Sequence, residues 1–365
     1  MKRVLTGVLC VLILFLLFLP VCATENEIID SVFDTASSDV QSYLDDLGIH
    51  NGSLQELSGV DLNDLLLLIK EMIIDKASRP FRVFVICVVI ILILTFSQSF
   101  AHGNDEMKRI TDCIGIVMII FTLLSPISEL IRAVLGTGNS LSVMIKTQIP
   151  VLAALLTISG NPAAAACIQG FSFGILQLFT QLITEISAPF SAVFICLVTS
   201  NSIQNMPFAE KTAAFFKKSV SFILTLLSGL FSAFLSLKSV LAVSADRVGI
   251  RGMKFIVGNM IPVVGSALSE AMSSVVSSVA LLKHTGCILS VVILFFTVAP
   301  MLTELMIWSF MMKALSLVSS VFAQDVCSSY FSSLDGLFVL QSVILIYQFF
   351  LSILGIILIM MMNGR

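Results

Sequence analysis

The sequence predicts an all-α protein: a polytopic transmembrane helix bundle, preceded by an N-terminal signal peptide and a small extracytoplasmic helical segment. Three observations predict this class. Of the 365 residues, 57% are hydrophobic and only 12% are charged, whereas soluble domains carry about 25% charged residues. Apolar runs of the ~20 residues that a bilayer needs recur along the chain. The chain also opens with two basic residues and a long apolar run, as secretory signals do.

Residues 1–23 are the predicted signal peptide. The stretch MKRVLTGVLCVLILFLLFLPVCATENE has small residues at the expected cleavage positions, and cleavage is expected after Ala23. Two alternatives stay open, namely an uncleaved anchor and a lipid anchor on Cys22. Each of the three readings leaves residues 24–78 outside the cytoplasm.

Residues 24–78 are predicted to form acidic, amphipathic extracytoplasmic helices. This segment holds 12 of the 23 acidic residues but only two basic ones, Lys70 and Lys76. Apolar residues recur at helical spacing in two groups: Ile29, Val32, Phe33, Ala36, Val40, Leu44 and Leu47, then Leu65, Ile69, Met72 and Ile73. Such a short segment cannot bury a large core, so we expect these helices to lie on the membrane or to pack on a partner.

Residues 79–365 are predicted to form a polytopic membrane domain of about seven to nine membrane segments. The clear spans are 81–101, 110–131, 163–184, 219–241, 286–308 and 337–362. Two weaker spans are 143–160, which contains Pro150, and 188–205; the stretch 256–282 is unusually rich in small residues. Basic residues favour the cytoplasmic side, which fits 102–109 but not the loop of Arg247, Arg251 and Lys254, so the topology stays open.

Broken helices are expected near 143–160 and 256–282. The stretches IPVLAALLTISG (149–160) and IPVVGSALSEAM (261–272) resemble each other, and each follows a basic residue. Paired broken helices in two halves of a chain are typical of secondary transporters. A structural repeat of this kind is one interpretation of the pattern.

The stretch 256–282 supplies the candidate site. A helix that begins at proline would carry its small and polar residues on one stripe: Pro262, Gly265, Ser266, Ser269, Glu270, Ser273 and Ser277. Such a stripe allows tight helix packing, or it faces a polar conduit or a partner protein. Glu304 follows Pro300 and is the second candidate intramembrane charge. An ion relay through Glu270 and Glu304 is a further alternative.

Enzymatic motifs, cofactor motifs and metal-ligand spacings are absent from the sequence. The eight cysteines form no CxxC pair, and most lie in apolar runs. No charge pattern suggests nucleic-acid binding. We therefore expect a non-enzymatic protein whose surroundings are membrane lipid and protein partners.

The block DRVGIRGMKFIVGNMIPVVGSALSEAMSSVVSSVALLKHTG (246–286) closely resembles the signature block of the stage III sporulation protein AE family. The matching positions are Gly249, Gly258, Pro262, Val264, Gly265, Glu270, Ala271, Lys283 and Gly286. The overall plan of signal, acidic segment and polytopic body is also similar.

The resemblance implies a function. Members of this family belong to endospore-forming bacteria and act in the mother-cell membrane that surrounds the forespore. With other stage III sporulation operon proteins, including an ATPase, and a forespore membrane partner, they are thought to build a channel complex that sustains late forespore gene expression. Residues 24–78 would then lie between the two membranes, and the stripe would be a subunit contact or a conduit wall. A self-contained secondary transporter and a non-conducting scaffold are the alternatives.

Overall fold

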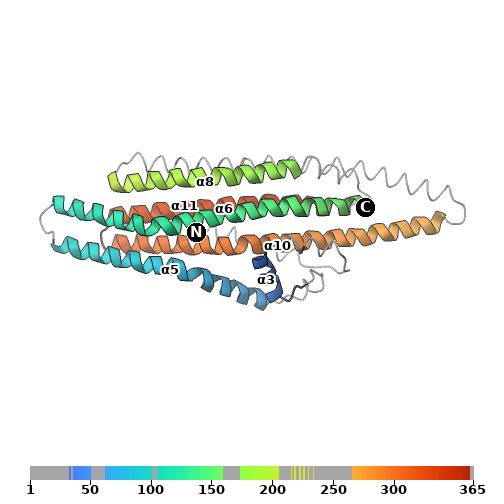
Figure 1. The fold of residues 1–365 in the computed structure, drawn as a ribbon, viewed down its shortest axis with the longest axis horizontal. Helices are drawn as coiled ribbons and strands as arrows, with labels where there is room; N and C mark the ends of the chain where they lie inside the picture. The colour runs from blue at the N-terminus through green and yellow to red at the C-terminus, as the bar shows by residue number, and fades with distance from the viewer. Residues whose placement is uncertain are drawn as a thin grey trace.

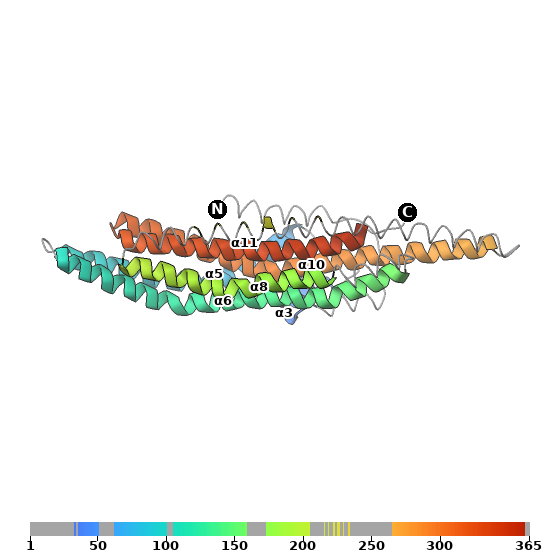
Figure 2. The ribbon, with the colours of Figure 1, turned by 90° about the horizontal axis from the view of Figure 1, so that it is seen from above.

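The computed structural model describes residues 36–50, 62–100, 105–158, 173–204 and 265–361, with single positions at 33 and between 215 and 233. The predicted signal peptide, residues 1–23, lies outside the described residues. The helices are α3 (Ser38–Asp46), α5 (Leu62–Phe100), α6 (Asp105–Ile158), α8 (Phe173–Gln204), α10 (Gly265–Val321) and α11 (Asp325–Met361). The five long helices run side by side along one axis as an elongated bundle (Figures 1 and 2). The described part of the chain is therefore all-helical, as predicted.

Helices α10 and α11 form an antiparallel hairpin closed by a three-residue turn. Ala323 adopts a positive φ of 55°. The N–H of Gln324 donates to the Ser319 carbonyl (2.9 Å), and the N–H of Ala323 donates to the Ser320 carbonyl (3.1 Å). This pattern of two backbone hydrogen bonds is the Schellman ending of a helix. It stops α10 and reverses the chain at once.

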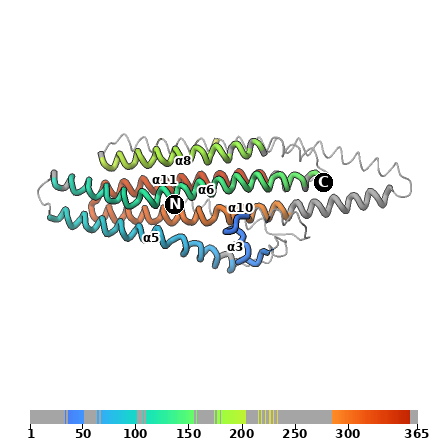
Figure 3. The backbone as a smooth tube through the Cα atoms, in the orientation of Figure 1, coloured from blue at the N-terminus to red at the C-terminus, as the bar shows by residue number. Residues whose placement is uncertain are grey.

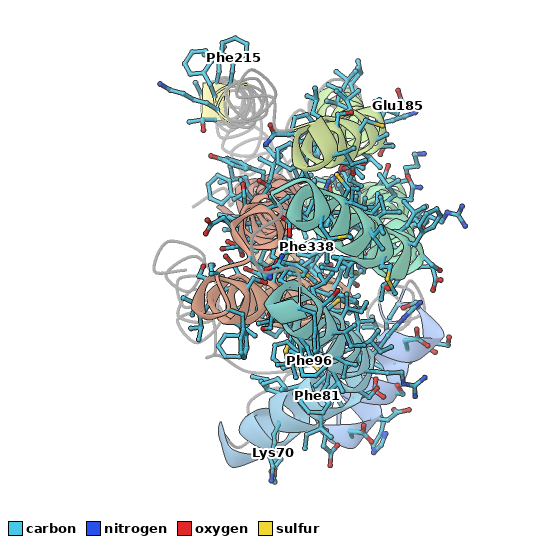
Figure 4. The ribbon with its side chains drawn as sticks, turned by 90° about the vertical axis from the view of Figure 1, so that its left-hand side faces the viewer. Lys70, Phe81, Phe96, Glu185, Phe215 and Phe338 are labelled. Carbon is cyan, nitrogen blue, oxygen red and sulfur yellow. The ribbon has the colours of Figure 1, made fainter. Side chains whose placement is uncertain are left out.

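The hairpin is the centre of the bundle. In the most apolar stretch of α10, 83% of the residues are buried, against 28% for α5 and 33% for α6. The largest buried side chains include Phe296, Trp308, Phe331 and Phe338, and the rings of Trp308 and Phe338 lie 6.0 Å apart. Helices α5 and α6 pack on α10, and α8 and α6 pack on α11. Seen end-on, Phe338 lies among the helices (Figure 4).

The proline-containing helices are continuous, which differs from the expected break near 143–160. Helix α6 runs through Pro126 and Pro150 to Ile158. Near Pro150, the Thr147 hydroxyl donates to the carbonyls of Val143 (3.2 Å) and Met144 (3.1 Å). Pro150 lacks the N–H that would donate to the Lys146 carbonyl, and packed neighbours with local backbone adjustment allow such a proline inside membrane helices.

Several expected segments consequently belong to the same helix. Helix α6 contains both 110–131 and most of 143–160, and α8 joins the described part of 163–184 to 188–204. Helix α10 is unbroken from Gly265, so the described part of 256–282 continues directly into 286–308. Within the described ranges, five helices are long and apolar enough to cross a membrane. The expected span 219–241 lies outside these ranges.

The N-terminal segment packs on its own chain. Val40 and Leu44 of α3 are buried, and the Tyr43 ring stacks on Phe296 of α10 at 6.3 Å. Figure 3 shows α3 between α10 and the N-terminal end of α5. On α5, Met72 is buried but Ile73 is exposed.

Candidate functional site

The predicted small-residue stripe lies at the start of α10. Gly265, Ser266, Ser269, Glu270, Ser273 and Ser277 are all on this helix, whereas Pro262 lies outside the described residues. The side chains of these stripe residues also lie outside what the structure describes. The choice between a packing surface and a conduit face therefore stays a prediction.

An ion pair joins the two helices of the central hairpin. The Lys313 ammonium lies 3.2 Å from Oδ1 of Asp335, and the Ser309 hydroxyl donates to the same oxygen. Ser309 and Lys313 are one helical turn apart on α10, so both reach one carboxylate of α11. The Asp335 side chain is 15% exposed and that of Lys313 is 34% exposed. Charged pairs inside apolar spans commonly mark functional sites.

Asp335 was not among the residues that the sequence indicated. The predicted span began at residue 337, which placed Asp335 just outside the membrane. Helix α11 in fact begins at Asp325, and the signal was the isolated aspartate in SSLDGLF (332–338). Its partners lie across the hairpin on α10, and no pattern around Asp335 identifies them.

Glu304 is half-buried on α10, and basic groups of α5 lie close enough to act on its charge. It interacts electrostatically with Lys76 and Arg79. Arg79 also forms an ion pair with Glu129 of α6, and the Ser125 hydroxyl donates to Glu129 Oε1 (3.0 Å). Charged groups from three helices thus meet at one level of the bundle.

A buried polar seam joins α8 to α11. Its members are Thr180, Thr184, Ser187 and Ser191 of α8 and Gln341 and Gln348 of α11, all buried. The Ser187 hydroxyl donates to Gln341 Oε1 (2.9 Å), and Gln341 Nε2 donates to Ser191. About two turns further along α11, Gln348 Nε2 donates to the Thr184 hydroxyl (2.6 Å) and the Thr180 carbonyl (3.3 Å). Each glutamine therefore binds α8 at two points.

Helix α6 closes the seam from a third side. A Cβ atom on Gly138 would lie 3.1 Å from both Gln348 Oε1 and Thr184 Oγ1. Gln177 Nε2 of α8 donates to the Ser142 hydroxyl of α6 (2.5 Å). Glycine at 138 thus permits a close approach of three helices around the Gln348 amide.

The seam was not predicted, although the sequence contains one pattern that is typical of such a contact. Thr180, Thr184, Ser187 and Ser191 recur at spacings of four and three, which is the spacing of one helix face. The same spacing of small polar residues at 266–277, where a proline and a glutamate are also present, was predicted to be the site. The seam is a hydrogen-bonded contact between helices. Across the described ranges, no group of three or more His, Cys, Asp or Glu residues is placed to hold a metal ion.

Comparison with known proteins identifies the family. A family model described as Stage III sporulation protein AE matches residues 38–363. The Stage III sporulation protein AE of Bacillus subtilis (strain 168) is 25% identical over 210 residues, which cover 58% of this chain and 52% of that protein. The aligned part thus spans about half the length of that relative. No solved structure matches the chain. Since the family match extends over nearly the whole sequence, the chain belongs to the Stage III sporulation protein AE family.

Proposed function

We propose that this chain is an integral membrane component of the channel or secretion-like complex that links mother cell and forespore. In this role it is needed for late forespore gene expression and spore formation. The family match and the five apolar helices support a multi-pass membrane protein of sporulation. The proposed location is the mother-cell membrane around the forespore, with residues 24–78 on the intermembrane side. The proposed partners are other stage III sporulation operon proteins, including an ATPase, and a forespore membrane protein.

The packing of the central hairpin supports a structural rather than an independently conducting role. Trp308, Phe331 and Phe338 fill the space around α10 and α11. Water-filled conduits are lined by polar groups that remain available to the cargo, whereas Gln341 and Gln348 bond to α8. We infer that the chain supplies a rigid block of helices and that any conduit forms between subunits. This role needs no catalytic residue.

A deletion tests the proposed role directly. An in-frame deletion in the source organism is expected to block development after engulfment and to remove heat-resistant spores. A late forespore reporter should fall silent, and the wild-type gene should restore it. Normal spore numbers in the deletion strain would remove the sporulation role.

A pair of variants separates a conduit subunit from a pure scaffold. A scaffold needs its contacts but not the charges of its candidate carboxylates, so Glu270→Gln and Glu304→Gln should then be silent. Under the same reading, charge reversals in residues 36–50 should release partners from the complex. If Glu304→Gln instead stops the forespore reporter while the complex still assembles, the scaffold reading is wrong.

A self-contained secondary transporter is the second candidate, and the Lys313–Asp335 pair favours it. Ionisable pairs at membrane depth serve as relays in transporters. This reading predicts solute flux in liposomes that contain the purified chain alone. The flux should be lost in Asp335→Asn and in Glu270→Gln. Liposomes that show no flux with any tested solute gradient would favour the subunit role.

A further inference from the structure

The long helices exceed the thickness of a bilayer. Helix α6 has 54 residues and α10 has 57, which correspond to ~80 Å and ~85 Å at 1.5 Å per residue. The hydrocarbon core of a bilayer is about 30 Å thick. Only part of these helices can therefore contact lipid chains in a straight crossing, and the polar side chains indicate which part.

One polar level lies at the hairpin turn. Gln324 Nε2 donates to Gln98 Oε1 (2.8 Å), and Gln98 Nε2 donates to Gln324 Oε1 (3.2 Å). Gln98 also donates to Asp112 of α6. These bonds connect the C-terminal end of α5, the N-terminal end of α6 and the turn between α10 and α11, which meet at the same end of the bundle (Figure 1). We call this set the turn-side level.

The second polar level is formed by Arg79, Glu129 and Glu304, the charged groups described above; we call it the charged level. The number of residues between the two levels is similar on the three helices. It is about 19 from Arg79 to Gln98, about 17 from Asp112 to Glu129 and about 20 from Glu304 to Gln324. At 1.5 Å per residue, each separation is ~25–30 Å. Three helices thus give the same separation. It equals the thickness of the hydrocarbon core of a bilayer.

The outward face of α6 changes its chemistry at the charged level. One continuous exposed stripe follows the helix from end to end. Between the two levels its large members are apolar: Ile114, Val117, Met118, Phe121 and Leu124. From Ser125 onward it is mainly polar or charged: Ser125, Ser128, Glu129, Arg132, Asn139, Ser140, Lys146 and Thr147. The change occurs within about one turn of the continuous helix α6.

Helix α5 shows the same change. Between the levels its exposed large residues are Phe81 and Arg82, which lie beside the charged level, and after them only apolar ones: Val85, Ile86, Val89, Leu92, Ile93 and Phe96. Beyond Arg79 the exposed residues include Asp64, Lys70, Glu71, Asp75 and Ser78, interspersed with Leu67, Ile73 and Ile74. In the end-on view, Phe96, Phe81 and Lys70 follow one another outward from the centre of the bundle (Figure 4).

We propose that the bilayer surrounds the bundle only between the turn-side level and the charged level. The exposed apolar side chains of α5 and α6 in this interval contact lipid acyl chains. The remainder of α6, α10 and α11 projects beyond the membrane surface as a helical stalk with a polar outer face on α6. Because Tyr43 stacks on Phe296, which lies on the far side of Glu304 from the turn, α3 belongs to the stalk.

This placement puts the Lys313–Asp335 pair inside the membrane interval. On α10, Lys313 lies about midway between Glu304 and Gln324, ~15 Å from either level. The seam, in contrast, extends from the interval at Ser191 into the stalk at Thr180. The placement depends on the exposed faces and polar levels alone, so it stands or falls independently of the proposed role in sporulation.

Labelling of matched positions on α6 tests the placement. Met118 is 49% exposed and lies between the levels, while Val143 is 54% exposed and lies in the stalk. Met118→Cys and Val143→Cys are introduced separately into the full chain with its eight native cysteines replaced. The variants are placed in nanodiscs of phosphatidylethanolamine and phosphatidylglycerol, which open both membrane faces to a charged maleimide. Labelling after denaturation in detergent gives the total thiol of each variant.

We expect labelling to be about tenfold faster at position 143 than at position 118. A thiol surrounded by hydrocarbon forms little thiolate, and the hydrocarbon itself excludes the charged reagent. Any excess above about threefold supports the placement. A smaller excess, or faster labelling at 118, overturns it.

A second measurement avoids the loss of buried cysteines. Trp308 is the only tryptophan, so its fluorescence is a constant background for Met118→Trp and Val143→Trp in the native sequence. Brominated acyl chains should quench the added signal at 118 and leave that at 143 unchanged. Equal quenching at the two positions contradicts the proposed interval.

Discussion

The α10–α11 hairpin and the α5–α6 pair are both apolar enough to cross a membrane, yet they occupy opposite environments. In the most apolar stretches, 83% and 67% of the residues of α10 and α11 are buried, but only 28% and 33% of those of α5 and α6. The central hairpin contacts protein on most sides, whereas the outer pair leaves Phe96 and Phe121 exposed. An apolar run therefore identifies a membrane segment but not its place in the bundle. Substitutions that affect one pair and spare the other measure this difference.

The largest expected difference concerns large aromatic residues. Phe338→Ala removes a fully buried ring beside Trp308 and should lower the free energy of unfolding by about 3–5 kcal/mol. Phe121→Ala removes an exposed ring of α6 and should change it by less than about 0.5 kcal/mol. Thermal unfolding in detergent or nanodiscs compares the two variants. Similar losses of stability would show that α6 is as closely packed as the hairpin.

The second difference concerns ion pairs. Asp335→Asn leaves Lys313 without its counter-charge inside the hairpin. We expect a loss of about 1–3 kcal/mol, less than for a fully buried pair because Lys313 is partly exposed. The double variant Asp335→Asn/Lys313→Met should recover part of this loss, since it removes the unpaired charge. Denaturation midpoints of the single and double variants give the coupling between the two residues.

Glu129→Gln is the matched control on the outer pair. The Arg79–Glu129 ion pair is exposed, and exposed pairs contribute little to stability. Glu129→Gln should therefore lower the free energy of unfolding less than Asp335→Asn does, and the decrease should be smaller still at high salt. A larger effect for Glu129→Gln than for Asp335→Asn would reverse the assignment of inner and outer charges.

A smaller effect is expected in the seam. Gln348→Leu leaves the Thr184 hydroxyl and the Thr180 carbonyl without their α11 partner. Hydrogen bonds between membrane helices contribute about 0.6 kcal/mol on average, so two bonds predict a loss of about 1 kcal/mol. The control is Gln181→Leu, which removes an exposed bond to Glu185 (2.9 Å) and should be close to neutral. Equal unfolding temperatures for both variants would mean that the seam adds no stability.

The smallest expected effect is a difference between two neighbouring glycines of α6. Gly136→Ala meets nothing within 4 Å, so the higher helix propensity of alanine should stabilise α6 by up to about 1 kcal/mol. Gly138→Ala would crowd the Gln348 amide and the Thr184 hydroxyl at 3.1 Å and should lose most or all of that gain. The difference in unfolding temperature between the two variants measures how closely α6 approaches the seam. Equal stabilisation would show that the approach is loose.

The sequence predicted the class of the fold, because composition and apolar run length depend on local information. The predicted spans 81–101 and 286–308 fall in the much longer helices α5 and α10, whose full lengths were not predicted. It did not predict that α6 passes through Pro150, since a proline inside an apolar run usually ends or kinks a helix. The sequence also did not predict contacts between distant residues. Gln341 bonds to Ser187, which is about 150 residues away, and polar residues on one helix do not reveal which helix they contact. The predicted stripe 262–277 and the signal peptide stay predictions.

The contact between Tyr43 and Phe296 also has a consequence for the order in which the molecule is built. The two residues are separated by about 250 positions, so at 5–20 residues per second the ribosome needs roughly 12–50 s to make the second after the first. During that interval α3 has been synthesised but its partner on α10 has not. Its apolar residues Val40 and Leu44 then lack the surface that later buries them. A chaperone or an assembly partner that binds α3 has this period to act, and the arrival of α10 ends it.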